Sequence, residues 1–199
     1  MSLPRIAWAG AAPRGQGHVA LFASVALALS SLAAATPPPV EAQVSARGIG
    51  PLLLGVPLAE ASRRTRPLDP AAAMIGPGCD ERDQITVVLQ VAGEPMSVMA
   101  MANAQGRIEE ILATPAGNAG VKLADADACR AHGAQLAARL APALGAMPPW
   151  SVQHKPVSTE FSFVFGGQTG ERTRVVSRWF AGGRTCDLLL QFGDRSASP

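Results

Sequence analysis

The stretch that decides the fold is Ile85-Thr-Val-Val-Leu-Gln-Val91, followed by Met96-Ser-Val-Met-Ala-Met-Ala102 and Arg107-Ile-Glu-Glu-Ile-Leu-Ala113. In the first segment, apolar residues at every second position alternate with Thr86 and Gln90, which is typical of a strand with one buried face. Gly93-Glu-Pro95 and Asn103-Ala-Gln-Gly106 separate the three segments as short turns. We therefore predict a three-stranded antiparallel meander over residues 85–113.

A second group of strands follows a long helix. Asp125 is a suitable N-cap, Gly145 a suitable stop, and the apolar residues between them recur at helical spacing, which predicts a helix ending near Leu144. Phe161, Phe163 and Phe165 then alternate with smaller residues, and 174–180 and 185–192 are expected as the last two strands. We expect loops through Trp150 and over residues 166–173.

Upstream of the meander, residues 48–55 indicate a short apolar strand and Leu58–Thr65 a short helix after Pro57. The chain thus contains two helix-plus-three-strand halves, at 43–115 and 121–193, and a flexible tail at 194–199. Antiparallel strands beside covering helices indicate the α+β class, with one short and one long helix packed on antiparallel sheet. Whether the halves are a diverged duplication stays open, because their residues barely match; both can belong to one domain.

Residues 1–42 have the pattern of a secretory signal peptide. Arg5 and Arg14 precede an uncharged apolar run from about Val19 to Ala35, and Val40-Glu-Ala42 offers small residues two positions apart. The competing interpretation is an uncleaved membrane anchor, which the serines and alanines of the run and the prolines 37–39 disfavour. We expect cleavage near Ala42, a periplasmic or secreted protein, and no membrane span after cleavage.

The charge balance excludes one class of partner. The full chain has 17 basic and 15 acidic residues, and removal of Arg5, Arg14 and Glu41 leaves fifteen and fourteen. The closest basic cluster lies at residues 63–66 and is too small to form the positive stripe that binds a phosphate backbone. We therefore expect no nucleic-acid partner.

The chain has three cysteines, and an exported protein is expected to form disulfides. Cys129 lies on the apolar face of the predicted long helix, and Cys186 shares a strand face with Leu188 and Leu190. Packing of that helix on that strand favours a Cys129–Cys186 disulfide. Cys79 is then a free thiol in a loop rich in proline and glycine, and either half-buried or available as an intermolecular bridge or redox group.

No catalytic motif is found in the sequence. His132, on the long helix, and His154, expected in a loop, are interpreted as surface residues. Glu109 and Glu110 are adjacent on a strand, so we expect them to point to opposite faces and not to form a carboxylate pair. The acidic loop at residues 80–83 lacks the spacing of a calcium site and is interpreted as solvated.

Met96, Met99 and Met101 form the one metal pattern in the chain. Thioether sulfur suits Cu(I), which an exported protein can meet. On a strand, however, Met99 and Met101 share one face and Met96 lies on the other, and methionine commonly fills cores. We favour core packing, and we expect no metal or other cofactor.

The stretch Ser45-Ala-Arg-Gly-Ile-Gly-Pro-Leu-Leu-Leu-Gly-Val-Pro-Leu-Ala-Glu60 resembles the opening of many small exported bacterial domains. It is similar to the outer-membrane-assembly lipoprotein domain (SmpA/OmlA-like) and to β-lactamase-inhibitor-protein-like folds. Those openings have a Gly-Met-Ser/Thr step before the helix, where this chain has Val56 and Pro57. A second patch runs from Cys129 to Gly145 and on to Cys186. The resemblance implies protein–protein contact, peptidoglycan or envelope upkeep, and carries over no catalytic residue.

We expect an exported, non-enzymatic cell-envelope protein that binds another envelope protein. The candidate interaction surface is the loop-rich edge with Trp150, Gln168 and Trp179, because exposed tryptophans often anchor interfaces. The other interpretation of both tryptophans is core packing. The alternative function is a periplasmic copper carrier or a small envelope enzyme that uses Cys79, His132 or the methionines. The oligomeric state stays open.

Overall fold

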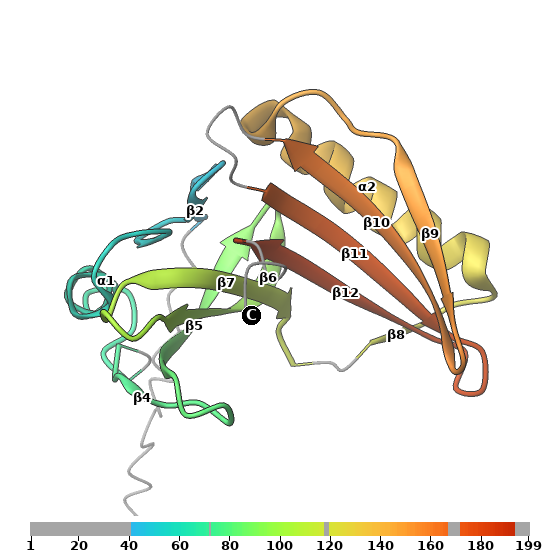
Figure 1. Ribbon diagram of the computed structural model, residues 1–199. Coiled ribbons are helices and arrows are strands. Elements are labelled where there is room, and N and C mark those ends of the chain that lie inside the picture. Colours follow the sequence, from blue (N-terminus) through green and yellow to red (C-terminus); the bar gives the residue numbers. More distant parts are fainter. Residues whose placement is uncertain (1–40, 72, 118–119, 167–171, 194–199) are drawn as a thin grey trace, which may run out of the picture. The chain divides into compact units, whose positions relative to one another are not determined.

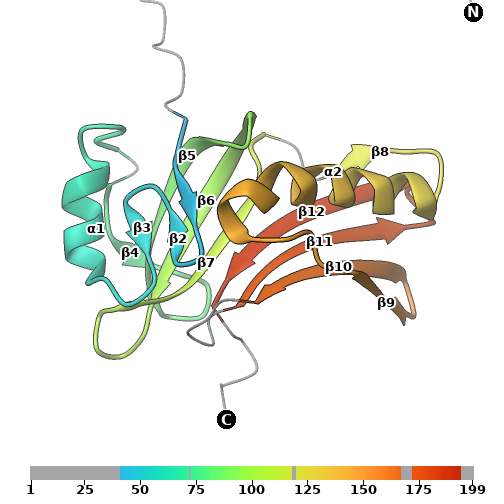
Figure 2. The same ribbon diagram turned by 90° about the horizontal axis from the view of Figure 1, so that it is seen from above.

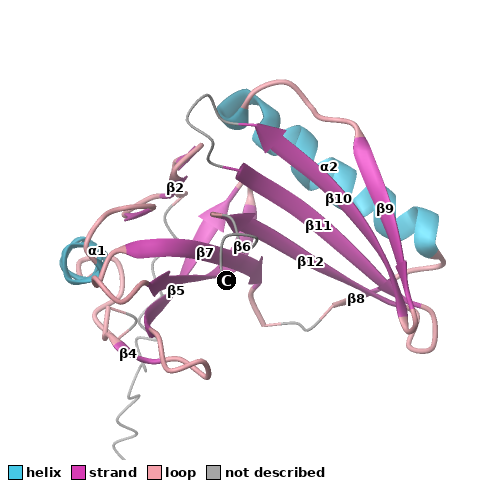
Figure 3. Cartoon of the chain, viewed as in Figure 1, coloured by secondary structure: helices cyan, strands magenta, loops and turns pink. Residues whose placement is uncertain are grey.

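The computed structural model describes residues 41–71, 73–117, 120–166 and 172–193. The predicted signal peptide lies outside these ranges except for Glu41 and Ala42, and the tail at 194–199 lies outside them entirely. The fold is α+β, with one short and one long helix packed on antiparallel sheets of nine and three strands (Figure 1 and Figure 3). The predicted fold class is confirmed.

The large sheet is antiparallel throughout and joins both groups of strands. Its order is β4 (Gly76–Pro77), β5 (Asp83–Val91), β6 (Glu94–Ala102), β7 (Ile108–Pro115), β12 (Thr185–Phe192), β11 (Arg172–Phe180), β10 (Ser158–Gly166) and β9 (Trp150–Lys155), while β8 (Val121–Lys122) also pairs with β12. The last strand of the first group therefore pairs with the last strand of the second, and these two strands form the middle of the sheet.

The predicted meander is confirmed in β5, β6 and β7, but its first turn is tighter than predicted. Ala92 and Gly93 form the turn with φ angles of 52° and 81°. Such positive values suit the two-residue hairpins whose twist matches that of the strands. Glu94 and Pro95, which the sequence places in the turn, belong to β6, where Pro95 lies opposite Gln90.

Three strands of the large sheet are missing from the sequence prediction. Residues 150–155, expected as a loop, form β9, which pairs with β10 through six residue pairs. All six side chains of β9 are exposed. An exposed strand does not need the alternation of apolar and polar residues that reveals a half-buried one, so this strand has no burial signal. The other two strands, β4 and β8, have only two residues each.

Both predicted helices are confirmed. Helix α1 covers Leu58–Thr65 with Pro57 at its N-cap, and helix α2 covers Ala126–Leu144. The Asp125 side chain accepts a hydrogen bond of 2.8 Å from the N–H of Ala128, and Gly145 caps the other end with φ 106°. An aspartate at this position satisfies one of the N–H groups that a first helical turn leaves without partners.

The segment before α1, predicted as one short strand, instead forms three strands of two residues each. These are β1 (Val44–Ser45), β2 (Gly48–Ile49) and β3 (Leu52–Leu53), in that order in the small sheet. Gly48 permits this tight winding, because its φ is 147° and a Cβ there would lie 2.1 Å from the carbonyl oxygen of Leu52. Side chains larger than hydrogen do not fit at this position.

The core lies on one face of the nine-stranded sheet. Both helices and the small sheet contribute to one apolar cluster with that face, as Ile49, Leu58 and Leu136 show by their burial against Val98 and Leu190. Figure 2 shows these elements on the same side of the sheet. Among the described residues, no helix or second sheet packs on the opposite face, which we call the open face.

The register of the sheet defines the open face. One row of cross-strand partners crosses six strands, and cross-strand partners share a face. The row consists of Thr86, Met99, Leu112, Gln191, Arg174 and Val164.

Candidate functional site

The open face carries a cluster of three carboxylates around one arginine, which we call the carboxylate cluster. The Arg82 side chain donates to Asp80 Oδ2 at 2.6 Å, to Glu109 Oε1 at 3.0 Å and to Glu110 Oε2 at 3.2 Å. Its Nη2 also lies 3.3 Å from the sulfur of Met101. The side chain of Glu110 is only 5% exposed, so its charge depends on these partners.

A β-bulge brings Glu109 and Glu110 to the same guanidinium, so the prediction that their side chains point to opposite faces is wrong. Met101 pairs with Glu110, whereas the next residue of β6, Ala102, pairs with Ile108. Glu109 is therefore an extra residue in β7. A bulge interrupts the alternation of side chains along a strand, so neighbouring residues no longer need to point to opposite faces.

A glutamine links this cluster to the second group of strands. Gln191, on β12, donates from Nε2 to Glu110 Oε1 at 3.0 Å, and its side chain is buried. Gln191 is also the cross-strand partner of Arg174 on β11. The polar residues of the open face therefore continue from β7 across β12 to β11.

The second charged group has the opposite composition, with three cations around one carboxylate; we call it the cation cluster. Glu160 Oε2 accepts from Lys155 Nζ at 2.7 Å and from Arg178 Nη2 at 3.0 Å. Arg174 Nη2 lies 3.5 Å from Glu160 Oε1 and 3.1 Å from Ser162 Oγ. The Glu160 side chain is 7% exposed, whereas each of the three cationic side chains is more than one third exposed.

These contacts shift the pKa values of Asp80, Arg82 and Glu160. The hydrogen bond from Arg82 lowers the pKa of Asp80 despite some loss of solvation, and the same bond to Asp80 is the main reason that the pKa of Arg82 is raised. Burial alone would raise the pKa of Glu160, but the hydrogen bonds and charges of Lys155 and Arg178 outweigh it and lower this pKa. Each of these three shifts favours the charged form of its side chain.

The two clusters give the open face two regions of opposite charge. The carboxylate cluster holds three carboxylates and one guanidinium, and the cation cluster holds three cations and one carboxylate. A hollow of about 400 Å³ that Asp80, Arg82 and Asn103 help to line borders the first cluster. Another of about 420 Å³ borders Lys155 of the second.

The tryptophans that the sequence suggests as interface anchors lie in different environments. Trp150 is 46% exposed on β9, where its ring contacts Phe161 edge-on and lies 4.9 Å from the Arg130 guanidinium carbon. Trp179 is buried beside Phe161 in a small second core cluster, which agrees with the core interpretation of this residue and not with a surface anchor. Gln168 lies outside the residues that the structure describes.

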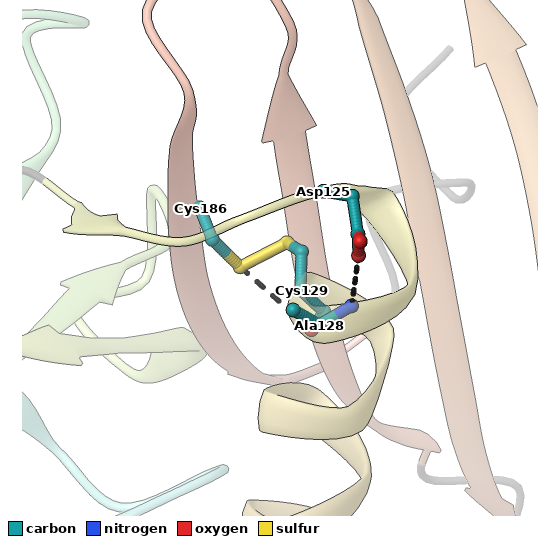
Figure 4. The surroundings of a disulfide bond; sticks show 4 residues. All are labelled: Asp125, Ala128, Cys129 and Cys186. Carbon is teal, nitrogen blue, oxygen red and sulfur yellow. Dashed lines mark hydrogen bonds between the residues drawn. A yellow bond between two sulfur atoms is a disulfide. The ribbon is translucent and has the colours of Figure 1, made fainter.

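The predicted disulfide is present. Cys129 on α2 and Cys186 on β12 are bonded and almost fully buried, next to the N-cap of the helix (Figure 4). The remaining cysteine, Cys79, is exposed and free, in the loop between β4 and β5.

The remaining candidate residues are the two histidines and the methionines, of which Met101 contacts the carboxylate cluster. His132 is half-buried on α2, and His154, predicted in a loop, lies on β9 with Nδ1 3.3 Å from Thr159 Oγ1. Met96 is buried on the core face, and Met101 contacts Arg82 on the open face. The three methionines are thus divided between two faces. Within the described part of the chain, no group of three or more His, Cys, Asp or Glu side chains is placed to hold a metal ion.

Comparison with known proteins finds no family model, no curated protein and no solved structure that matches this chain. No helix among the described residues is long and apolar enough to cross a lipid bilayer. The charged clusters of the open face are therefore identified from the geometry of this chain alone.

Proposed function

We propose that this chain is an exported, non-enzymatic cell-envelope protein that binds another protein through the open face of its nine-stranded sheet. The observation that carries the proposal is the pair of oppositely charged clusters on that face. Arg82 and Glu160 each hold the surrounding charges in place by hydrogen bonds. A partner with the complementary charge pattern would be oriented on the sheet by these charges.

Apolar residues on the same face support a protein as the partner. Antiparallel sheets commonly leave one face in water, and that face is then mostly polar. Here Val88 and Val164 are 50% and 38% exposed on the open face. Met99 and Leu112 lie between them in half-buried positions. Protein interfaces combine such apolar patches with a charged rim.

Two observations support export. Residues 1–35 contain the charged and apolar regions of a secretory leader. In addition, a buried disulfide such as Cys129–Cys186 is typical of oxidising compartments.

Ala42 is buried, and its N–H donates to the Gln90 carbonyl at 2.7 Å. In place of the predicted site near Ala42, we therefore propose cleavage upstream of Glu41, where Ala33-Ala-Ala35 offers small residues two positions apart.

Site-specific photo-cross-linking tests the binding face. A photoreactive amino acid is placed at Val88 or Val164 on the open face, and at Ala138, which is exposed on α2, as the matched control. In living cells we expect a discrete adduct from both open-face positions and not from Ala138, and we expect high salt to weaken it in extracts because charges contribute. Equal labelling from all three positions, or no adduct from any, contradicts the proposal.

A further inference from the structure

Among the described strands, β9 is an edge of the large sheet that no further strand pairs with. It pairs with β10 on one side, and all six of its side chains are exposed (Figure 1 and Figure 2). Natural edge strands are usually blocked by charges, prolines or bulges, because a free edge can pair with another strand. Lys155 is the only charged residue of β9, and Glu160 neutralises it at 2.7 Å.

The register shows which backbone groups of β9 are available. Pro156 and Val157 form a two-residue turn, so Lys155 and Ser158 close the hairpin as a hydrogen-bonded pair. Hydrogen-bonded and non-hydrogen-bonded pairs alternate from there. The N–H and C=O groups of Trp150, Val152 and His154 therefore point away from β10, toward the free edge.

The side chains of the same three residues form an exposed row on the sheet face that α2 covers. Trp150 and Val152 are 46% and 45% exposed, and His154 is also exposed. Helix α2 packs mainly on β10 and β11, and Arg130 of this helix lies against the Trp150 ring. This row is apolar or uncharged, with its backbone groups directed outward.

We propose that two copies of this chain associate through β9, antiparallel, about a two-fold axis at Val152. In this register Trp150 lies opposite His154 of the second copy, Val152 lies opposite its own equivalent, and His154 lies opposite Trp150 of the second copy. Each of these pairs exchanges two N–H···O=C bonds. The two sheets become one continuous sheet, as in other isologous two-fold interfaces.

Prolines at both ends of the strand fix this register. Trp150, Val152 and His154 direct their backbone groups toward the free edge. Pro148 lies two residues before Trp150 and Pro156 two residues after His154, and neither proline has an N–H to donate. A shift of two residues in either direction would bring Pro148 or Pro156 opposite a strand residue and leave fewer complete pairs. The arrangement centred on Val152 is the one that pairs all three outward residues.

The charges of the edge also fit a second copy. Across the two-fold axis, Ser151 lies opposite Gln153 of the second copy, and Lys155, already bonded to Glu160, lies opposite Pro149. No like charges are therefore placed in cross-strand positions, where they would be destabilising. Lys155 is the one residue that this edge shares with the cation cluster, and the three outward-directed residues lie on the face that α2 covers. The association therefore does not depend on the proposed function.

Sedimentation velocity of the purified, oxidised protein over a concentration series tests the proposal. We expect a monomer–dimer equilibrium for the natural chain. Val152→Lys places two ammonium groups opposite each other at the axis, and we expect it to raise the dimer dissociation constant by roughly tenfold or more. Val157→Lys is the matched control, because Val157 is 75% exposed in the turn and lies outside the paired residues.

Cysteine cross-linking tests the register without weakening the interface. In a Cys79→Ala background, Val152→Cys places two thiols in a cross-strand pair with Cα atoms about 5.5 Å apart, within disulfide reach. Ser151→Cys places them on the diagonal, at about 7–8 Å. We expect oxidised glutathione to link the Val152→Cys chains faster. The proposal is overturned by a natural chain that stays monomeric, by unchanged association of Val152→Lys, or by equal linking of both cysteine variants.

Discussion

The Cys129–Cys186 disulfide gives the sharpest stability prediction. It joins residues 57 positions apart in sequence, and both cysteines are at most 1% exposed. It ties the first turn of α2 to β12, and β12 is the strand that pairs with β7 of the first group. Reduction of the bond should therefore loosen the helix-covered part of the sheet.

The expected magnitude follows from the length of the closed loop. In the chain-entropy treatment, a cross-link over 57 residues removes about 14 cal/mol/K from the unfolded chain, which is about 4 kcal/mol at room temperature. A small domain is stabilised by only about 5–15 kcal/mol in total. The reduced protein should thus retain its fold near room temperature but unfold at a much lower denaturant concentration.

Urea unfolding of a Cys79→Ala background, oxidised and reduced, measures this difference without thiol exchange from the exposed Cys79. Both forms keep the two buried sulfur atoms, so the change in the free energy of unfolding reports the cross-link alone. A Cys129→Ala/Cys186→Ala variant adds the loss of packing, which we expect to cost about 1–2 kcal/mol more. A difference below about 1 kcal/mol between the oxidised and reduced forms would refute the loop-entropy reasoning.

Three further predictions concern single positions. Gly133→Ala should destabilise the protein by about 1–3 kcal/mol in urea unfolding, because the added Cβ would lie 2.6 Å from Ser177 Oγ. Gly182→Ala is the control, since a Cβ there meets nothing within 4 Å. Glu160→Gln should lower the free energy of unfolding by about 1–2 kcal/mol at neutral pH. The pKa of Glu160 is lowered in the folded protein, so the stabilisation by its carboxylate is present above the ordinary pKa of a glutamate and disappears as the pH falls through the folded value. The melting temperatures of the natural and Glu160→Gln proteins should therefore converge in acid. N-terminal sequencing of exported protein should retain Ala42, whose N–H bonds to Gln90, and a chain that begins at Gln43 would contradict that packing.

Where burial and capping act together, the sequence predicts the structure well. Asp125 and Gly145 mark the ends of α2 because the end groups of a helix need specific partners and backbone conformations. The disulfide between Cys129 and Cys186 could be predicted because the helix face that bears Cys129 and the strand face that bears Cys186 are both apolar. In each case, local chemistry and burial favour the same result.

The sequence fails where a feature depends on strand pairing. Strand β9 has no buried face, and only its pairing with β10 identifies it. From its residue type alone, Trp179 could be either an exposed anchor or a core residue, and its place opposite Cys186 buries it beside the disulfide. A bulge such as the one at Glu109 depends on the partner strand, so a periodicity of two along β7 could not reveal it.

That bulge connects the fold with the candidate site. Only three residue pairs join β7 to β12, whereas eight join β11 to β12. Two further contacts extend the short junction at the bulge: Gln191 donates to Glu110, and the backbone of Gly193 approaches Glu109 so closely that a Cβ there would lie 2.3 Å from its carbonyl oxygen. The extra residue that lets both glutamates reach Arg82 thus also lies where the two groups of strands meet. A substitution at Glu110 is expected to change both the stability of this junction and the charge of the open face. Binding assays on this side of the sheet should therefore substitute Glu109, the exposed neighbour.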